Sequence, residues 1–63
     1  MSLPVGTKVR LLSDVISCGK VIAQKGDVCE AIEQPEGWHY WDYLLSKGVT
    51  MFGVMSENIE VVK

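Results

Sequence analysis

The fold is decided by residues 35–55, which read PEGWHYWDYLLSKGVTMFGVM. Their first three residues form a turn, because Pro35 presets φ at its entry and Gly37 supplies a positive φ at its exit. The aromatic and β-branched residues that follow favour a strand over a helix. We therefore expect a strand over Trp38–Leu45, paired as an antiparallel hairpin with the chain before the turn.

Turn residues and short β-rich runs alternate over the rest of the chain as well. No window keeps helical periodicity for three turns without a Gly or Pro. Gly48 suits the left-handed position of a three-residue loop, and Ser13–Lys25, which lacks clean alternation, is interpreted as a long folded-over loop. The other expected strands are Lys8–Leu12, Asp27–Gln34, Val49–Met55 and Ile59–Val62. Such spacing predicts one all-β domain over residues 1–63, in which five strands curl into a small barrel.

Four short stretches carry a resemblance to a known family. Val9–Asp14 is similar to its opening strand, Lys25–Val28 to the Lys-Gly-Asp-Ile run that follows its long RT loop, and Glu36–Trp38 to the turn before its binding-face Trp. Gly53–Ile59 is similar to its fourth strand and the 3-10 turn before the last strand. The chain thus resembles an SH3-like barrel, most closely the divergent bacterial SH3-like and KOW-like barrels. This resemblance implies a long RT-type loop, a 3-10 turn before the fifth strand, and a bacterial or phage source.

The same comparison bears on the ligand. SH3 domains that bind PxxP peptides hold them between aromatic side chains, and Trp38 corresponds to one of these. The tyrosines of the family's opening run are replaced by Ser13 and Val15, and its acidic RT-loop cluster is missing. We therefore do not expect PxxP peptides to bind on the usual face.

The aromatic run 38–43 indicates a binding surface. In a strand, Trp38 and Tyr40 share a face with Asp42, and a small barrel cannot bury both faces of such a strand. Exposed Trp and Tyr are typical anchors of protein interfaces. We expect a protein partner to contact Trp38, Tyr40, Asp14 and Val15, so that the chain acts as an interaction module or accessory subunit. The open alternative is that the two rings merely cover the end of the barrel.

Charge and self-association give two alternative functions. The net charge is −2, which disfavours a dedicated nucleic-acid binder. Residues 1–25 nevertheless hold four cations against Asp14, and these could form a basic patch that binds nucleic acid. That patch would comprise Lys8, Arg10, Lys20 and Lys25. A homodimer, or another homo-oligomeric structural protein, would instead use the exposed aromatic face as its seam.

The remaining reactive residues predict no chemistry. Cys18 and Cys29 form no CxxC pair, and His39 is the single histidine, so we expect two free thiols, no metal site and no cofactor. Cys29 is expected to be buried and Cys18 exposed, whereas Met51 and Met55 are expected to fill gaps in the core. No catalytic constellation is visible, which predicts a non-enzyme. No apolar run reaches the ~20 residues of a membrane span, and the N-terminus lacks signal-peptide features, so we expect a cytoplasmic protein without membrane contact.

Overall fold

The computed structural model describes residues 3–62, and these form seven strands and one 3-10 turn. The all-β class is confirmed, as is the 3-10 turn before the last strand. The elements in chain order are β1 (Lys8–Leu11), β2 (Val15–Ser17), β3 (Lys20–Ala23), β4 (Val28–Ala31), β5 (Tyr43–Lys47), β6 (Thr50–Val54), η1 (Ser56–Asn58) and β7 (Ile59–Val61).

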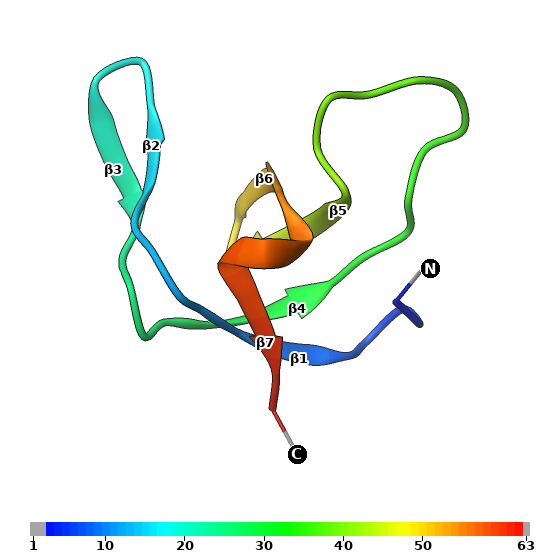
Figure 1. The fold of residues 1–63 in the computed structure, drawn as a ribbon, viewed down its shortest axis with the longest axis horizontal. Coiled ribbons are helices and arrows are strands. Elements are labelled where there is room, and N and C mark those ends of the chain that lie inside the picture. Colours follow the sequence, from blue (N-terminus) through cyan, green and yellow to red (C-terminus); the bar gives the residue numbers. More distant parts are fainter. Residues whose placement is uncertain (1–2, 63) are drawn as a thin grey trace.

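Five of the strands form an antiparallel sheet in the order β6-β5-β4-β1-β7, and β2 and β3 form a separate hairpin (Figure 1). Hydrogen bonds do not join the edge strands β6 and β7 in the part of the chain that the structure describes. The sheet is therefore open and is not the closed barrel that we expected. The physical reason is the path of η1, which carries the chain to the far side of β1, where β7 pairs through Val9↔Val61 and Leu11↔Ile59.

The core lies on one face of this sheet. Alternation along β1 places Val9 and Leu11 inside and leaves Lys8 and Arg10 in water. The completely or nearly completely buried side chains come from five strands: Val9, Leu11, Ala23, Cys29, Ala31, Leu45, Phe52 and Val54. As predicted, Cys29 is buried in this core and Cys18 is exposed, and both are free thiols.

The two methionines do not fill the core, which corrects the prediction made for them. Phe52 and Val54 take the inward positions of β6, so the period of two turns Met51 outward, opposite Ser46 of β5. Met55 follows the strand and is exposed beside η1.

Residues 13–25 form a hairpin, not the folded-over loop that we expected. β2 and β3 pair antiparallel, and their register shifts between Val15 and Ile16. A two-residue turn, Cys18–Gly19, closes the hairpin with φ of 52° and 77°, the positive values that a type I′ turn requires. The broken register hid the strand alternation in the sequence.

The strand predicted over Trp38–Leu45 is also displaced. β5 begins only at Tyr43, and residues 32–42 form a long loop. Gln34 holds the first part of this loop against β5. Its Nε2 donates to the Ile32 and Leu44 carbonyls, and its Oε1 accepts a hydrogen bond from the Leu44 N–H at 2.6 Å. An amide side chain thus takes the place of a backbone partner beside Leu44, and the β4–β5 ladder ends there.

The turn between β5 and β6 is shorter than predicted and begins later in the chain: it has two residues and not three, and Gly48 is its first residue. Lys47 pairs with Thr50, so Gly48 and Val49 form a two-residue connection. Gly48 has a φ of 62°, which suits the first position of a type II′ turn.

Candidate functional site

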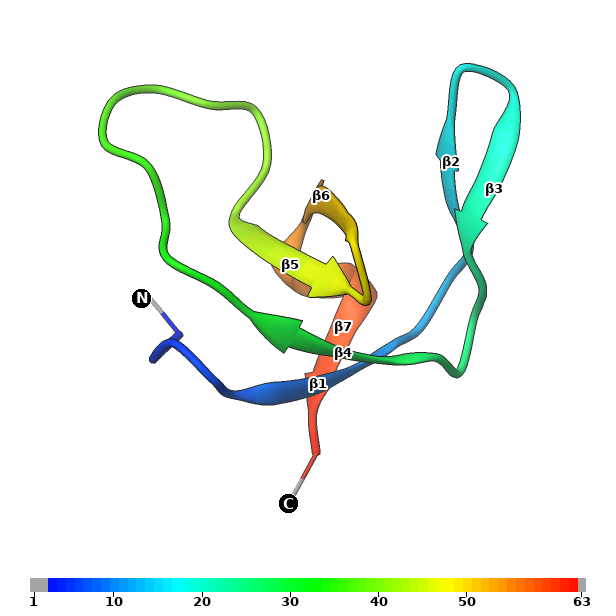
Figure 2. The same ribbon diagram turned by 180° about the vertical axis from the view of Figure 1, so that it is seen from behind.

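Two arms rise from the sheet on either side of β6 and η1. They are the β2–β3 hairpin and the loop of residues 32–42, and both views show them apart (Figures 1 and 2). Between them lies a groove of about 200 Å³. Its lining residues are Leu11, Ser13, Asp14, Val15, Ile16, Tyr40, Trp41, Gly53, Val54, Met55 and Asn58.

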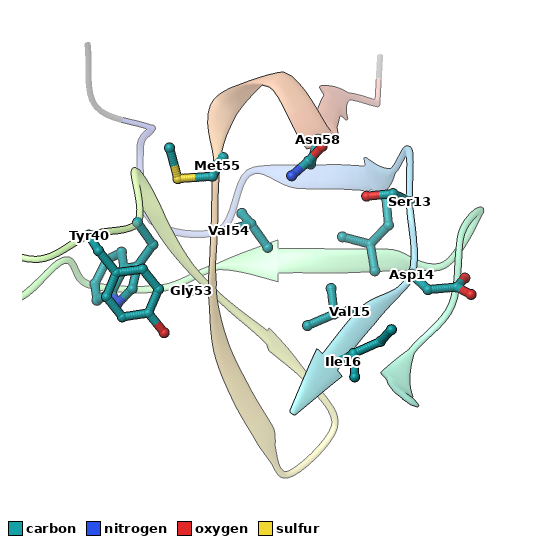
Figure 3. Close-up of a pocket in the computed structure, with 11 residues that line it drawn as sticks. Ser13, Asp14, Val15, Ile16, Tyr40, Gly53, Val54, Met55 and Asn58 are labelled. Carbon is teal, nitrogen blue, oxygen red and sulfur yellow. The ribbon is translucent and has the colours of Figure 1, made fainter. Parts of the chain in front are cut away.

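The hairpin supplies one wall of this groove. Val15 is half-buried and packs against the core, whereas Ile16 is 65% exposed. Asp14 stands at the base of the arm, where its Oδ1 accepts a hydrogen bond from the Lys25 N–H at 2.8 Å. This contact ties the start of the hairpin to its end, and the Asp14 carboxylate points away from Tyr40 (Figure 3).

The opposite wall depends on a contact between Trp41 and Gly53. A Cβ atom at Gly53 would lie 2.2 Å from Cγ of Trp41, so the indole lies directly against the glycine backbone. The ring of His39 stacks on Trp41, with centroids 3.8 Å apart and planes 5° apart. Nδ1 of His39 lies 2.7 Å from the carbonyl oxygen of Trp41, which fixes the imidazole over the indole. Trp41 is therefore held between β6 and His39.

Asp42 connects the same arm to η1. Its carboxylate accepts a hydrogen bond from the Ser56 N–H at 2.7 Å, and its own N–H donates to the Val54 carbonyl. The bond from Ser56 lowers the pKa of Asp42 below its usual value. An ionised Asp42 thus positions the 3-10 turn, and with it Met55 and Asn58, at the end of the groove.

The structure brings together three of the four residues predicted for partner binding. Asp14, Val15 and Tyr40 line one groove, and the Tyr40 side chain is 78% exposed above it (Figure 3). Trp38 does not line the groove, although it lies on the same loop of residues 32–42 as Tyr40 and is 90% exposed to solvent. Both rings are exposed as expected, but from a loop and not from a strand face.

Sequence reasoning missed Trp41 and Ile16 as lining residues. In the predicted strand Trp41 lies on the face opposite Trp38 and Tyr40, but the strand begins only at Tyr43, and Ile16 falls in the segment that was expected to be a loop. A single signal was available for Trp41: Gly53 interrupts an otherwise β-rich run, and a strand glycine often marks the close approach of another group.

The cations predicted for a nucleic-acid patch are divided. Lys8 and Arg10 point outward from β1 and form ion pairs with Glu30 and Glu60 on the neighbouring strands. The other two lie on the hairpin, with Lys20 at the start of β3 and Lys25 after its end. The sheet face therefore carries alternating charges where a phosphate backbone would require an excess of cations.

Neither a metal centre nor a membrane-spanning helix is found among the described residues. Among residues 3–62, no three His, Cys, Asp or Glu side chains stand close enough together to hold a metal ion. Burial raises the pKa of the Cys29 thiol, which keeps it protonated. Within the same residues there is no helix with the length and apolar character to cross a bilayer.

Comparison of the chain with protein-family models, with curated proteins and with solved structures finds no match.

Proposed function

We propose that this chain is a non-enzymatic protein-interaction module, related in fold to the SH3-like small barrels, whose groove between the two arms holds a segment of a protein partner. The observation that carries the proposal is the convergence of Asp14, Val15 and Tyr40 on one groove, beside an open Trp38. Large aromatic side chains contribute much contact area at a low entropic cost, which is why they are enriched among interface anchors.

Further features support the SH3-like part of the proposal. The strands follow each other across the sheet as β6-β5-β4-β1-β7, a long hairpin separates β1 from β4, and a single 3-10 turn leads into β7. These elements occur in the order that the sequence resemblance implies. Because one fold serves many functions, the binding activity rests on the groove and not on the fold.

The test is affinity capture from the source lysate with three variants, followed by titration of the purified partner. Tyr40→Ala and Ile16→Ser change exposed groove residues, whereas Val49→Ser changes a fully exposed residue of the β5–β6 turn and serves as the matched control. We expect the two groove variants to lose about tenfold or more in affinity, as interface anchors do, and the control to bind like wild type.

Two results would overturn the proposal. Equal binding by all variants would place the interface elsewhere, and recovery that disappears after nuclease treatment would indicate the basic-patch function. A separate Trp38→Ala variant measures whether the partner reaches beyond the groove to the open indole. Sedimentation velocity over a range of concentrations tests the homodimer alternative, because a seam at this face would make the chain self-associate without any partner.

A further inference from the structure

The groove is bordered by two strand edges that have no strand beside them. Within residues 3–62, β6 pairs with β5 alone and β2 pairs with β3 alone. β2 is the strand of the hairpin that lies nearer to β6, and its residues Val15 and Ile16 line the groove opposite Gly53 and Val54 (Figure 3). Both walls therefore present backbone groups as well as side chains.

The register determines which backbone groups face the groove. Lys47 and Thr50 close the two-residue β5–β6 hairpin and form a hydrogen-bonded pair, and in antiparallel strands such pairs alternate with non-bonded ones. The N–H and C=O groups of Met51 and Gly53 consequently point away from β5, toward the free edge. The same reasoning, applied to the Ser17–Lys20 pair that closes the β2–β3 hairpin, points the backbone of Ile16 outward from β2.

β6 also lacks the features that normally protect a free edge. Its five residues, Thr-Met-Phe-Gly-Val, include no charge and no proline, and its register with β5 is unbroken. β7, at the other edge of the sheet, is only three residues long and carries Glu60 at its centre. Because unprotected edges promote pairing with other chains, proteins usually blunt them. The asymmetry between the two edges marks β6 as the one open to pairing.

We infer that the partner segment binds in this groove as an added β-strand, which pairs with the free edge of β6 through Met51 and Gly53 and lies against β2 on its other side. This inference rests on the proposed function and specifies its ligand. The ligand is an extended, apolar segment of a protein, with a side chain turned toward Leu11, Val15 and Val54 and its backbone pairing with the strand edge.

The presence of β2 on the far side of the groove favours a peptide ligand over another copy of the chain. The β6 edge of another copy would bring its own β5 with it, because β6 belongs to a sheet. Because β2 borders the groove on the side opposite β6, a strand that enters it must be unpaired on both edges. Such a strand comes from a segment that is unstructured before it binds.

The test uses peptides selected from a random phage-displayed library against the wild-type protein, and synthetic copies of those that are enriched. In the complex, we expect the amide protons of Met51 and Gly53 to exchange about tenfold or more slowly than in the unbound protein, because each gains a hydrogen bond. Methylation of the peptide's backbone nitrogens one at a time should reduce affinity at every second position, which is the period of a strand.

A pair of proline variants tests the edge from the protein side. Met51→Pro removes an N–H that points to the free edge of β6, and Val61→Pro does the same on the free edge of β7, since Glu60 supplies the paired groups there. Proline is tolerated at such outward positions of edge strands. We expect Met51→Pro to weaken peptide binding by about tenfold or more and Val61→Pro to change it by less than about twofold.

The outcomes separate the two proposals. Peptides that bind in the groove without slowing exchange at Met51 and Gly53, or without a period of two in the methylation series, would overturn strand addition and leave the interaction module standing. Failure to enrich any peptide on the wild-type protein would overturn both. The methylation series uses only the wild-type chain, so the inference stays testable even if Met51→Pro does not fold.

Discussion

Replacing Gly53 with alanine tests the contact that builds one wall of the groove. The new Cβ would lie 2.2, 2.3 and 2.6 Å from three atoms of the Trp41 ring, where ordinary carbon contacts are near 3.5–4.0 Å. Cγ is the atom by which the ring joins its side chain, so the indole cannot avoid the methyl group by bending its far end. The indole also cannot move away from Gly53, because the His39 ring stacks on its other face with the ring centroids 3.8 Å apart.

The expected magnitude follows from two opposing effects. Overpacking of this kind costs about 1–3 kcal/mol, whereas replacing glycine by alanine at a compatible backbone stabilises by about 0.4–1 kcal/mol. Gly53 is compatible, because its φ lies outside the positive region. The net destabilisation of Gly53→Ala is therefore about 1–2 kcal/mol, which would lower the midpoint of thermal unfolding by about 5–15 °C in a domain of this size.

A double-mutant cycle isolates the contact. In a Trp41→Ala background, Gly53→Ala should be neutral or stabilising by about 0.4–1 kcal/mol, giving a coupling energy near 2 kcal/mol. Urea unfolding followed by circular dichroism supplies the four free energies, with trimethylamine N-oxide added to keep the weaker variants folded. If Gly53→Ala destabilises both backgrounds equally, the glycine is needed for another reason, and the proposed packing of the Trp41 indole on the Gly53 backbone is wrong.

Three further predictions concern the parts that hold the two arms. Cys18→Asn should stabilise the protein by about 0.5–1 kcal/mol in urea unfolding, because Cys18 has a φ of 52° and asparagine tolerates that region better; an unchanged midpoint would contradict the type I′ assignment. Gln34→Ala should cost about 1–3 kcal/mol by the same assay, since the Leu44 N–H loses its acceptor and the Ile32 carbonyl loses a donor, whereas the Leu44 carbonyl keeps its bond from the Ile32 N–H; Gln34→Glu should not restore the stability fully because it lacks the donor. The third prediction concerns pH. The pKa of Asp42 is lowered by its bond from Ser56, so its stabilising effect is present above the unfolded pKa and is lost as pH falls through the folded one. Asp42→Asn keeps an acceptor oxygen without titrating, so its stability should fall less steeply than that of wild type between about pH 5 and pH 2, and parallel pH profiles would show that Asp42 contributes nothing.

Local sequence signals located most of the sheet. Strands over Lys8–Leu11 and Thr50–Val54 were expected within one residue at each end, because alternating burial and flanking turn residues are local properties. Gly37 has the positive φ expected of it, 95°, but it lies within the long loop of residues 32–42 and not in a hairpin turn. The 3-10 turn at Ser56–Asn58 was implied by the resemblance of Gly53–Ile59 to the SH3-like barrels. Whether the strands close into a barrel depends on contacts between the chain's distant ends, which no local pattern encodes.

The errors arise where a distant partner overrides the local pattern. Alternation in the run 38–45 predicts a strand, but the indole of Trp41 is drawn onto Gly53, twelve positions further along, and the backbone before Tyr43 loops out to allow it. In the β2–β3 hairpin, Cys18 adopts a left-handed conformation that its residue type does not suggest. The exposure of Trp38 and Tyr40 was predicted, but from a strand geometry that the chain does not have.

The anchoring of the arms explains how a groove made largely of loops can bind with specificity. Each arm is held by polar contacts outside the groove's apolar surface: Lys25 donates to Asp14 across the base of the hairpin, and Ser56 of η1 and Leu44 of β5 donate to Asp42 and Gln34 on the other arm. A preformed groove loses less conformational entropy on binding than a mobile one, and more of the contact energy then appears as affinity. Changes at these anchors should therefore weaken binding without removing a single contact to the partner, whereas changes at Ile16 or Tyr40 remove contacts and leave the arms in place. An interface built on flexible loops would show no such separation, because its anchors would contribute nothing.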